Sequence, residues 1–428
     1  DLWHSEGNSI DNNLILGGED GIYFSHSCSN VIRRNLLALN HRPPNEGHGI
    51  YLESSADNII CDNTLLKNDE GICLSWSGHN ILKDNNMTDN VYNFGVSGNS
   101  FSHFIEDIDI SNTINAKPIY YLTNKKNLTI DPLSFPDAAY IGVVNSTRIT
   151  IKNLNLTKNV QGALLAFVTD SLVENVTASN NVYGISLEVS NNNKIQGNTI
   201  TNNTDSGIYL YGSNENMLAG NNISSNYYGI RLLSCTRNTV DNDLVTNNDF
   251  CGVGLLSSSN NTISRITSQN SFAGIYFESS SGNLIVRSTV KYNTQYGAYL
   301  DGSSGNFIYQ NNFIDNSNQV WSISSKNVWD NGCEGNYWSD YDGTKFDDYG
   351  IGKTPYLIYK NNTDRFPLMS PYIPGDVNHD GKVNLNDIYI IAKAFRTEKG
   401  DENWNPHVDI NEDGAISLSD VYKAAREF

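Results

Sequence analysis

The sequence predicts an all-β protein, a right-handed parallel β-helix solenoid with a small helical module at its C-terminal end. Three observations predict this fold class. A frame of 22 or 23 residues opens at Gly184, Gly207, Gly229, Gly252, Gly274 and Gly297 without a break, and a fixed period of this size is typical of repeat architectures. Each frame alternates apolar and polar residues as a half-buried strand does. The pattern then changes completely near residue 375, where two short helical segments are expected.

The composition of the frame explains how its copies stack. Counting the glycine as position 1, positions 2, 4 and 12 are apolar in all nine copies that open between Gly21 and Gly297. One coil cannot bury these side chains, but coils stacked at the strand spacing of about 4.8 Å bury them in continuous columns. Position 10 is always asparagine, so we expect its amides to lie above one another and to hydrogen-bond along the stack. These asparagines are Asn30, Asn58, Asn80, Asn193, Asn216, Asn238, Asn261, Asn283 and Asn306.

Composition divides the chain into four expected parts, at residues 1–330, 331–371, 372–375 and 376–428. The first is the β-helix, whose frame loosens between Val91 and Ala139. Asn8 and Ile10 fit positions 10 and 12, so the chain shown begins within a coil, and we expect a preceding part or another chain to cover that end. Residues 331–371 are rich in aromatic and turn residues and are expected to cap the last coil. A short linker then leads to a separate module.

Charge and composition limit the possible partners and the compartment. The formal net charge is −19, which argues against nucleic acid, because phosphates require a basic surface. No apolar run reaches the length of a membrane-spanning helix. The six cysteines form no CxxC pair and are expected to be buried free thiols. The nine N-x-S/T sequons favour an extracellular or cell-surface glycoprotein. The sequons begin at Asn86, Asn127, Asn145, Asn155, Asn175, Asn202, Asn222, Asn260 and Asn361.

Two twelve-residue segments, Asp376–Asp387 and Asp409–Asp420, have the spacing of calcium-binding loops. In such loops side-chain oxygens stand at positions 1, 3 and 5, a glycine turns the chain at 6, position 7 offers its carbonyl, and a carboxylate closes at 12. We therefore expect two calcium ions as cofactors. The predicted ligands are Asp376, Asn378, Asp380, the carbonyl of Lys382 and Asp387, and then Asp409, Asn411, Asp413, the carbonyl of Ala415 and Asp420.

Each loop leads into a helical segment, IYIIAKAF or VYKAAREF, with no clear helix before it. This duplicated loop and helix resembles a dockerin type I module, and Asp at position 12 agrees with that resemblance. The resemblance implies a cohesin-like domain as partner, bound through the helices. The alternative is a cap stapled by calcium that binds no partner.

The coils resemble the NosD-like β-helix group over residues 8 to about 371. The resemblance is carried by the GI-x-L…N-x-I coils and by NAKPIYYL (Asn115–Leu122), GNYWSDY (Gly335–Tyr341) and RFPLM (Arg365–Met369). The family form of NAKPIYYL has glycine where Ala116 stands. The group includes carbohydrate-binding and sugar-hydrolase-like members, many of them on archaeal surfaces. Its namesake assists copper-site assembly, but three methionines and eight scattered histidines do not supply the soft donor cluster that copper prefers.

Position 5 of the frame points outward and offers candidates for catalysis. Glu278 and Asp301 stand there on adjacent coils, about 5 Å apart at the strand spacing, close enough to serve as an acid and base pair. Tyr276 and Tyr299 stand two residues earlier and are candidates for stacking on a sugar ring. An outer tyrosine ladder also packs strand to strand without any ligand. The paired aspartates of pectin hydrolases, the DPH signature of uronate epimerases and the basic cluster of pectate lyases are missing.

Two classes of function follow from these observations. The sequence favours a structural or assembly subunit at the cell surface, docked in a calcium-dependent manner through residues 376–428 to a cohesin-like domain or to neighbouring copies of the same chain. The alternative is a secreted polysaccharide-binding or polysaccharide-processing enzyme, a hydrolase or lyase, anchored by the same module.

Overall fold

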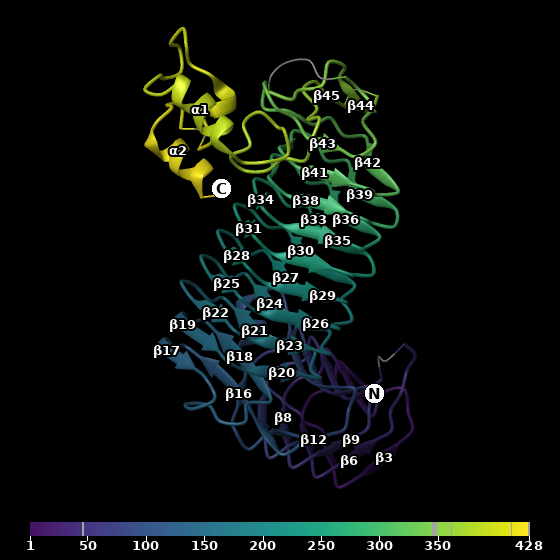
Figure 1. The fold of residues 1–428 in the computed structure, drawn as a ribbon. Helices are drawn as coiled ribbons and strands as arrows, with labels where there is room; N and C mark the ends of the chain where they lie inside the picture. Colours follow the sequence, from purple (N-terminus) through teal and green to yellow (C-terminus); the bar gives the residue numbers. More distant parts are fainter. Residues whose placement is uncertain (45–46, 345–348, 361, 412, 427–428) are drawn as a thin grey trace. The chain divides into compact units, whose positions relative to one another are not determined.

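The computed structural model describes residues 1–44, 47–344, 349–360, 362–411 and 413–426. The chain forms two compact units, unit 1 (Asp1–Asn238) and unit 2 (Thr239–Phe428). Both consist of parallel β-helix coils, and unit 2 also contains the helical module, so the predicted fold class is confirmed (Figure 1). No helix among the described residues is long and apolar enough to cross a membrane.

Unit 1 begins with coils over residues 1–114, which we call the first stack. Each coil contributes one strand to each of three faces. The first face contains β1 (Leu2–Trp3), β4 (Ile22–Ser25), β7 (His48–Glu53), β10 (Glu70–Ser75) and β13 (Tyr92–Ser97). The second contains β2 (Ser9–Asp11), β5 (Val31–Arg33), β8 (Ile59–Cys61), β11 (Ile81–Lys83) and β14 (Asp107–Ile108). The third contains β3 (Leu14–Leu16), β6 (Leu36–Ala38), β9 (Thr64–Leu66), β12 (Asn86–Thr88) and β15 (Thr113–Ile114), and a 3-10 turn, η1 (Phe101–Phe104), follows β13.

The second stack of unit 1 covers residues 117–238. Its first face contains β16 (Lys117–Thr123), β18 (Tyr140–Val144), β21 (Gln161–Ala166), β24 (Tyr183–Glu188), β27 (Ser206–Tyr211) and β30 (Tyr228–Leu233). The second contains β17 (Lys126–Ile130), β19 (Thr147–Lys152), β22 (Leu172–Glu174), β25 (Lys194–Gln196) and β28 (Met217–Ala219), and the third β20 (Asn155–Thr157), β23 (Thr177–Ser179), β26 (Thr199–Thr201) and β29 (Asn222–Ser224).

The loosened frame of the sequence is a break between these two stacks. β15 turns at Asn115 and Ala116 into β16, which pairs with it in antiparallel fashion and then in parallel with β18. The third face of the first stack therefore continues as the first face of the second stack. Ala116 has a φ of 64°, a left-handed conformation that glycine adopts more easily, which explains why the family form has glycine at this position.

The outer face of the second stack closes the end of the first. Leu164 and Ala166 occupy outward positions 3 and 5 of β21, yet both are fully buried and belong to the apolar core of the first stack together with Phe104. The contact is close, because a Cβ atom at Gly95 on β13 would lie 2.4 Å from the Cβ of Val160. The end of the first stack is thus covered by a later part of the same unit.

Within the stacks the predicted columns are present. The side chains at positions 2, 4 and 12 are buried, and Ile208, Leu210 and Leu218 have no exposed surface. Asn193 donates its backbone N–H and its side-chain amide to Oδ1 of Asn216, at 2.9 and 3.1 Å. Equivalent bonds recur at two further corners of the coil, for example from Asn198 to Asn221. These side chains satisfy buried backbone groups at each turn, which would otherwise cost about 1–3 kcal/mol each.

Unit 2 continues the same design without an interruption. Its first face contains β33 (Cys251–Leu256), β36 (Ala273–Glu278), β39 (Tyr296–Asp301) and β42 (Asn318–Ile323). The second contains β31 (Thr239–Asp241), β34 (Thr262–Ser264), β37 (Leu284–Val286) and β40 (Phe307–Tyr309), and the third β32 (Leu244–Thr246), β35 (Thr267–Gln269), β38 (Thr289–Lys291), β41 (Asn312–Ile314) and β43 (Tyr337–Trp338).

The described residues among 329–344, 349–360 and 362–368 cover the last coil of unit 2. A hairpin of β44 (Tyr356–Tyr359) and β45 (Asn362–Asp364) follows β43, and Trp329 and Trp338 are fully buried. Asp364 accepts hydrogen bonds from the Trp338 indole and the backbone of Asn336, at 2.9 and 2.7 Å. The helical module then contains α1 (Leu385–Lys393), a 3-10 turn η2 (Pro406–Val408) and α2 (Leu418–Ala425).

Candidate functional site

The two acidic loops of the module fold in the same way. The carboxylate of Asp376 accepts the backbone N–H groups of Asp380 and Gly381, at 3.1 and 2.9 Å. Asp409 accepts those of Asp413 and Gly414 in the second loop, at 3.2 and 2.8 Å. Both glycines have a positive φ, 87° and 85°, as the sharp turn at loop position 6 requires.

The carboxylate at position 12 of each loop also caps the helix that follows. Asp387 and Asp420 accept the N-cap backbone N–H of Asn384 and Ser417, at 2.7 and 2.9 Å, and the reciprocal bonds complete two capping boxes. An ion bound to the carboxylate at position 12 would therefore also fix the side chain that caps the N-terminus of each helix. Loop geometry and helix position are coupled through one side chain.

The donor chemistry of the loops fits calcium. Position 1 and position 12 carboxylates are buried in both loops, with 2% exposure for Asp376 and 0% for Asp387 and Asp420. Within the described part of the chain none of the three forms an ion pair with lysine or arginine. Burial raises the pKa of Asp376, because a buried negative charge without a cation is unfavourable. A bound divalent cation would compensate it, and Asn378, Lys382, Asn411 and Ala415 offer further oxygens at loop positions 3 and 7.

The helices present a duplicated apolar pair to solvent. Leu385 and Tyr389 on α1 are 73% and 62% exposed, and Leu418 and Tyr422 on α2 are 72% and 65% exposed. The members of the second pair follow those of the first by 33 residues. The cation that covers each tyrosine ring is repeated as well, Lys393 on α1 and Arg426 directly after α2. Large apolar side chains this exposed, in two matching copies, are typical of a binding surface.

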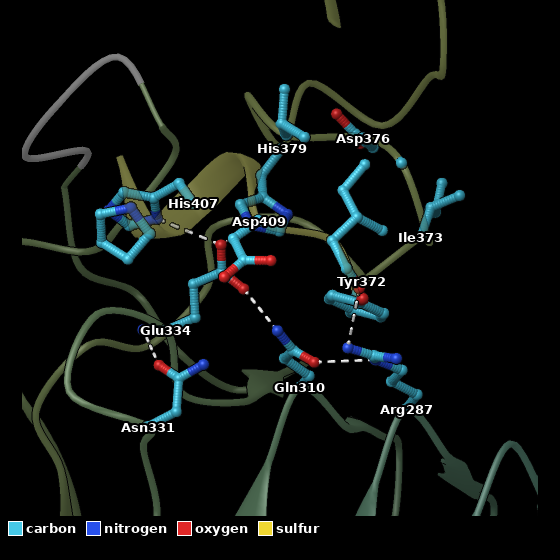
Figure 2. Close-up of a pocket in the computed structure, with 14 residues that line it drawn as sticks. Arg287, Gln310, Asn331, Glu334, Tyr372, Ile373, Asp376, His379, His407 and Asp409 are labelled. Atoms are coloured by element: carbon cyan, nitrogen blue, oxygen red, sulfur yellow. Dashed lines mark hydrogen bonds and ion pairs between the residues drawn. The ribbon is translucent and has the colours of Figure 1, made fainter. Parts of the chain in front are cut away.

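Glu334 attaches the module to the last coils of unit 2. Its Oε1 lies 3.1 Å from Nδ1 of His407 and 3.4 Å from Nε2 of His379, and its Oε2 accepts a hydrogen bond from Gln310 at 2.8 Å. Arg287 donates to Gln310 and to the carbonyl of Ile410, at 3.0 and 3.3 Å. Figure 2 shows this chain of side chains, with Glu334 between His407 and Gln310.

The electrostatics of this contact favour a charged carboxylate. Burial alone raises the pKa of Glu334, but the hydrogen bonds from His379 and His407 outweigh burial and hold its pKa far below the usual range. Tyr349 stacks on His407 with ring centroids 4.5 Å apart, and Asn405 donates to the Tyr349 hydroxyl at 2.7 Å. Within unit 2 the module therefore packs on the coils of its own chain.

The predicted outward residues of unit 2 lie together on one face. Glu278 and Asp301 are direct partners in the β36–β39 register, as are Tyr276 and Tyr299. The two tyrosine rings stack with centroids 5.2 Å apart, and the Tyr276 hydroxyl donates to Glu278 at 3.3 Å. Burial and the nearby Asp301 raise the pKa of Tyr299. The pairing agrees with the sequence, and a catalytic role for the acids stays a prediction.

The tyrosine pair belongs to a longer row of aromatic rings, which we call the aromatic ladder. Neighbouring rings have centroids 5.0–6.1 Å apart. Phe272, Trp321 and Tyr359 are between a third and two-fifths exposed, so the ladder offers faces to solvent over several coils. Its members are Phe250, Phe272, Tyr276, Tyr296, Tyr299, Trp321 and Tyr359.

A second group of possible metal ligands lies in unit 1. Among the described residues, His48, Glu70 and Cys73 are the one group of three such side chains whose ligand atoms all lie within 4.8 Å of one another, so the carboxylates within each calcium loop are more widely spaced than this. His48 faces Asp20 at 2.8 Å and Glu70 at 3.4 Å with its two ring nitrogens. Although burial lowers the pKa of His48, these carboxylates raise it to about 9.

The remaining predicted sites are placed as follows. The asparagines of eight sequons are exposed, and the ninth, Asn361, lies outside the described residues. The six cysteines are free thiols; Cys73, Cys235 and Cys251 are buried, whereas the other three are partly exposed. The expectation that all six are buried was therefore wrong for half of them. The exposed sequons are Asn86, Asn127, Asn145, Asn155, Asn175, Asn202, Asn222 and Asn260.

Comparisons with known proteins identify both parts of the chain. The model of the family described as periplasmic copper-binding protein (NosD) matches residues 1–117, 98–247 and 224–343. The chain belongs to the NosD family. The dockerin type I domain model matches residues 374–426, so this NosD-family chain contains a dockerin type I module, a type of module that binds calcium. No curated protein matches the chain.

Several solved structures are similar to this NosD-family chain at low identity. The A-module of mannuronan C-5 epimerase AlgE4 from Azotobacter vinelandii is 13% identical, with 75% of this chain and 88% of that chain covered and a TM-score of 0.36. The periplasmic alginate epimerase AlgG is 11% identical, with coverage of 72% and 78% and a TM-score of 0.33. A tailspike protein mutant of E. coli bacteriophage HK620 is 10% identical, with coverage of 73% and 58% and a TM-score of 0.40.

Sequence reasoning missed two groups of residues that the structure brings together. The Glu334 contact joins residues 73 positions apart, and no periodic signal marks it. Glu188 was expected to point outward at position 5 like Glu278, but it is only 7% exposed. The sequence contained a sign that this outer face is covered, because positions 3 and 5 of β21 are the apolar Leu164 and Ala166 rather than the tyrosine and acid found in β7, β36 and β39.

Proposed function

We propose that this chain is an extracellular, N-glycosylated surface protein whose β-helix is a structural subunit and whose dockerin module docks it to a cohesin-like domain. The observation that carries this proposal is the exposed apolar pair repeated on α1 and α2. Burial of one large apolar side chain stabilises a complex by about 1.5–3 kcal/mol, and such anchors at the centre of an interface dominate binding. The eight exposed sequons support an extracellular site for the chain.

Calcium makes this docking conditional. Two ions, one in each loop, would neutralise the buried carboxylates at positions 1 and 12 and hold the N-termini of α1 and α2 in place. Without them the buried carboxylates repel one another within each loop, and the capping boxes lose their rigid support. The apolar pairs on the two helices would then no longer form one defined surface.

Isothermal titration of the full chain with a type I cohesin domain tests the proposal. We expect binding in calcium and none in EDTA. A variant carrying Leu385→Asp and Leu418→Asp should lose at least a hundredfold in affinity, because two desolvated anchors become charges. The control is Leu357→Asp on β44, which is 78% exposed and lies outside the module. Binding that persists in EDTA, or in the double variant, would contradict docking through this surface.

The same apolar surface of α1 and α2 could instead bind a second copy of this chain. Sedimentation velocity in calcium and in EDTA distinguishes it, because docking to neighbouring copies would give calcium-dependent oligomers without any cohesin. A calcium-dependent oligomer that the Leu385→Asp and Leu418→Asp variant abolishes would replace the cohesin-like partner by a second copy of this chain.

A second candidate function is polysaccharide binding along the aromatic ladder. Its exposed rings repeat from coil to coil, and aromatic faces stack on sugar rings. Glu278 and Asp301 flank the Tyr276–Tyr299 pair and offer hydrogen-bond acceptors for hydroxyl groups. If the ladder is the binding face, Trp321→Ala should weaken retention of the chain on a polysaccharide gel, and Glu278→Gln should remove any cleavage of that polysaccharide. Unchanged retention of both variants would exclude this face.

A copper function is not proposed, because the donors do not fit. His48 directs both ring nitrogens at carboxylates and keeps its protons at neutral pH, so neither nitrogen has a free lone pair for a metal. Burial raises the pKa of the Cys73 thiol well above its usual value, which opposes the thiolate that copper binds. Among the described residues this is the one cluster of its kind.

A further inference from the structure

A hollow lies in unit 1 where the two coil stacks meet. It has a volume of about 300 Å³, at the lower end of the range for small-ligand sites. The first stack contributes residues at the ends of β10 and β13, and the second contributes residues of β21, β24 and β27. The lining residues are Ser75, Trp76, Ser97, Gly98, Asn99, Gln161, Tyr183, Glu188, Tyr209 and Tyr211.

Aromatic side chains from both stacks form the apolar part of this hollow. Tyr183 and Tyr209 stack on each other with centroids 5.1 Å apart, and the guanidinium of Arg231 lies 5.5 Å from the centre of the Tyr209 ring. Trp76 follows β10 in the first stack and is 47% exposed. An exposed indole beside two ordered phenol rings is the composition that recognises the apolar face of a sugar ring.

Glu188 is the one carboxyl group among the lining residues. Its Oε1 accepts a hydrogen bond from the hydroxyl of Ser186 at 3.0 Å. Burial raises its pKa to about 8, so at neutral pH the group is mostly protonated and can both donate and accept a hydrogen bond. Ligand hydroxyl groups need partners of this kind.

The charges around the hollow select against an acidic ligand. No lysine, arginine or histidine lines it. Arg231, which covers the Tyr209 and Tyr228 rings, is paired with Asp205 at 3.3 Å. A uronate or sulfate group in the hollow would therefore be desolvated without a counter-charge, which is unfavourable.

We propose that this hollow binds one uncharged pyranose residue of an oligosaccharide or polysaccharide, with the ring against Trp76 and the tyrosines and a hydroxyl group bonded to Glu188. The proposal rests neither on docking through the module nor on the aromatic ladder of unit 2. It concerns binding and not cleavage, because hydrolysis requires a second carboxyl group and the hollow contains one.

The test is calorimetric titration of the full chain at pH 6.5 with two sets of probes. One set contains neutral hexasaccharides of glucose, mannose, galactose and N-acetylglucosamine, and the other contains hexasaccharides of mannuronate and galacturonate. We expect at least one neutral probe to bind and the uronates not to bind. Trp76→Ala should reduce the affinity at least tenfold, and because Trp76 is largely exposed this variant should fold normally, as its circular dichroism spectrum will show.

A matched variant tests whether the loss is specific to this hollow. Trp3→Ala removes an exposed indole of the first stack that does not line the hollow and should leave binding of the same probe unchanged. The proposal is overturned if no neutral probe binds, if the uronates bind instead, if Trp3→Ala weakens binding as much as Trp76→Ala does, or if Trp321→Ala in the aromatic ladder rather than Trp76→Ala removes binding.

The pH dependence of the affinity tests the role of Glu188 separately. Affinity for the neutral probe should fall about tenfold between pH 6.5 and pH 9 as this group ionises, whereas Glu188→Gln should bind with an affinity that does not change over this range. The titratable groups around Glu188 include Tyr183, Tyr209, Tyr211, Cys235 and the Arg231–Asp205 pair, and burial raises the pKa of Tyr183, of Tyr209 and of Cys235. From the first stack the lining residues are uncharged. His103 accepts the backbone N–H of the lining residue Asn99 at 3.3 Å, and burial lowers the pKa of this histidine. A pH-dependent affinity that persists in Glu188→Gln would show that Glu188 does not contact the ligand.

Discussion

The coils of unit 1 and unit 2 follow one sequence pattern but differ in what their outer faces do. In unit 2 the frame runs from β33 to β42 without interruption, and its outward residues, such as Tyr276 and Tyr299, face solvent. In unit 1 the frame breaks at β15, and the outward residues Leu164 and Ala166 become core. A regular solenoid therefore presents a nearly uniform surface, and a hollow arises where the period is interrupted.

The break also changes how strand edges are satisfied. β13 is the last strand on the first face of the first stack, and its free edge would leave backbone groups unpaired. Phe94 accepts the backbone N–H of Val160 at 3.0 Å, and the side chain of Gln161 bonds the N–H and carbonyl of Val96, at 3.4 and 3.1 Å. In unit 2 each first-face strand from β33 to β39 instead pairs with the next coil. The five predictions below test this difference.

The largest loss of stability is expected when one of the stacked asparagines of the regular coils is replaced. Asn283→Leu removes the acceptor of two bonds from Asn261 and the donor to Ser258 and Asn306. At about 1–3 kcal/mol for each buried group left unpaired, unit 2 should lose about 5 kcal/mol. Hydrogen exchange of unit 2 peptides measures this loss. The control, Asn318→Ala, removes an amide that is exposed and should change stability by less than about 0.5 kcal/mol.

Glu334→Ala breaks the contact between the module and the end of the unit 2 coils. It leaves His379 and His407 without their carboxylate, and removing one partner of a buried pair costs about 3–5 kcal/mol. Residues 376–426 should then exchange amide hydrogens faster, and the linker at 372–375 should be cut sooner by protease, while coil peptides of unit 2 remain protected. Glu402→Ala, at an exposed position of the module, should change neither the amide exchange nor the rate of cleavage. If the module is equally protected in both variants, Glu334 does not hold it on the coils.

Gln161→Leu tests whether the break in unit 1 depends on its side-chain bonds. The substitution removes the bonds to Val96 and the acceptor of the Tyr140 hydroxyl at 3.1 Å. We expect a loss of about 2–3 kcal/mol and faster exchange at Tyr92–Ser97, with unit 2 unaffected. Gln196→Leu, at a half-buried position of the second stack, serves as the control. If the amides of β13 remain protected from exchange in Gln161→Leu, apolar packing alone holds β13 against the second stack.

Glu188→Gln should make the stability of unit 1 less dependent on pH. The folded pKa of about 8 lies above an unfolded value of about 4.3, so the stabilisation is complete below pH 4.3 and is lost as pH rises toward 8. Over the window from pH 6 to 8 the native chain should lose about 2 kcal/mol that the glutamine variant keeps. Urea unfolding at the two pH values measures this, and Glu278→Gln in unit 2 is the comparison. Parallel pH profiles for the native chain and Glu188→Gln would refute a protonated buried acid.

The smallest change in stability is expected from a substitution in the turn between the two stacks of unit 1. Ala116 has a positive φ of 64°, which costs about 1–2 kcal/mol for a residue with a Cβ, whereas glycine costs more entropy on folding. Ala116→Gly should therefore stabilise unit 1 by about 0.5 kcal/mol in thermal unfolding. Ala178→Gly, at a buried strand position in β23, should destabilise. Destabilisation by both changes would indicate that the turn is not strained.

Much of the fold could be predicted from sequence because its signals are periodic. The columns of Ile208, Leu210 and Leu218 and the asparagines beneath them repeat every 22 or 23 residues, and parallel stacking follows directly from that period. The candidate calcium ligands could also be proposed from sequence, since those of each expected ion lie within one twelve-residue loop. The pairing of Glu278 with Asp301 followed from register alone.

By itself the sequence determined which side chains stack in columns and which oxygens are the candidate ligands of each expected ion, because these relationships are local or periodic. Only the tertiary structure decided that Leu164 closes another stack, that Glu188 is covered, and that Glu334 meets two histidines of the module. Each of these contacts joins residues far apart in the chain at a place where the period stops. A repeating pattern carries information about its next copy, but not about what packs against its outer face.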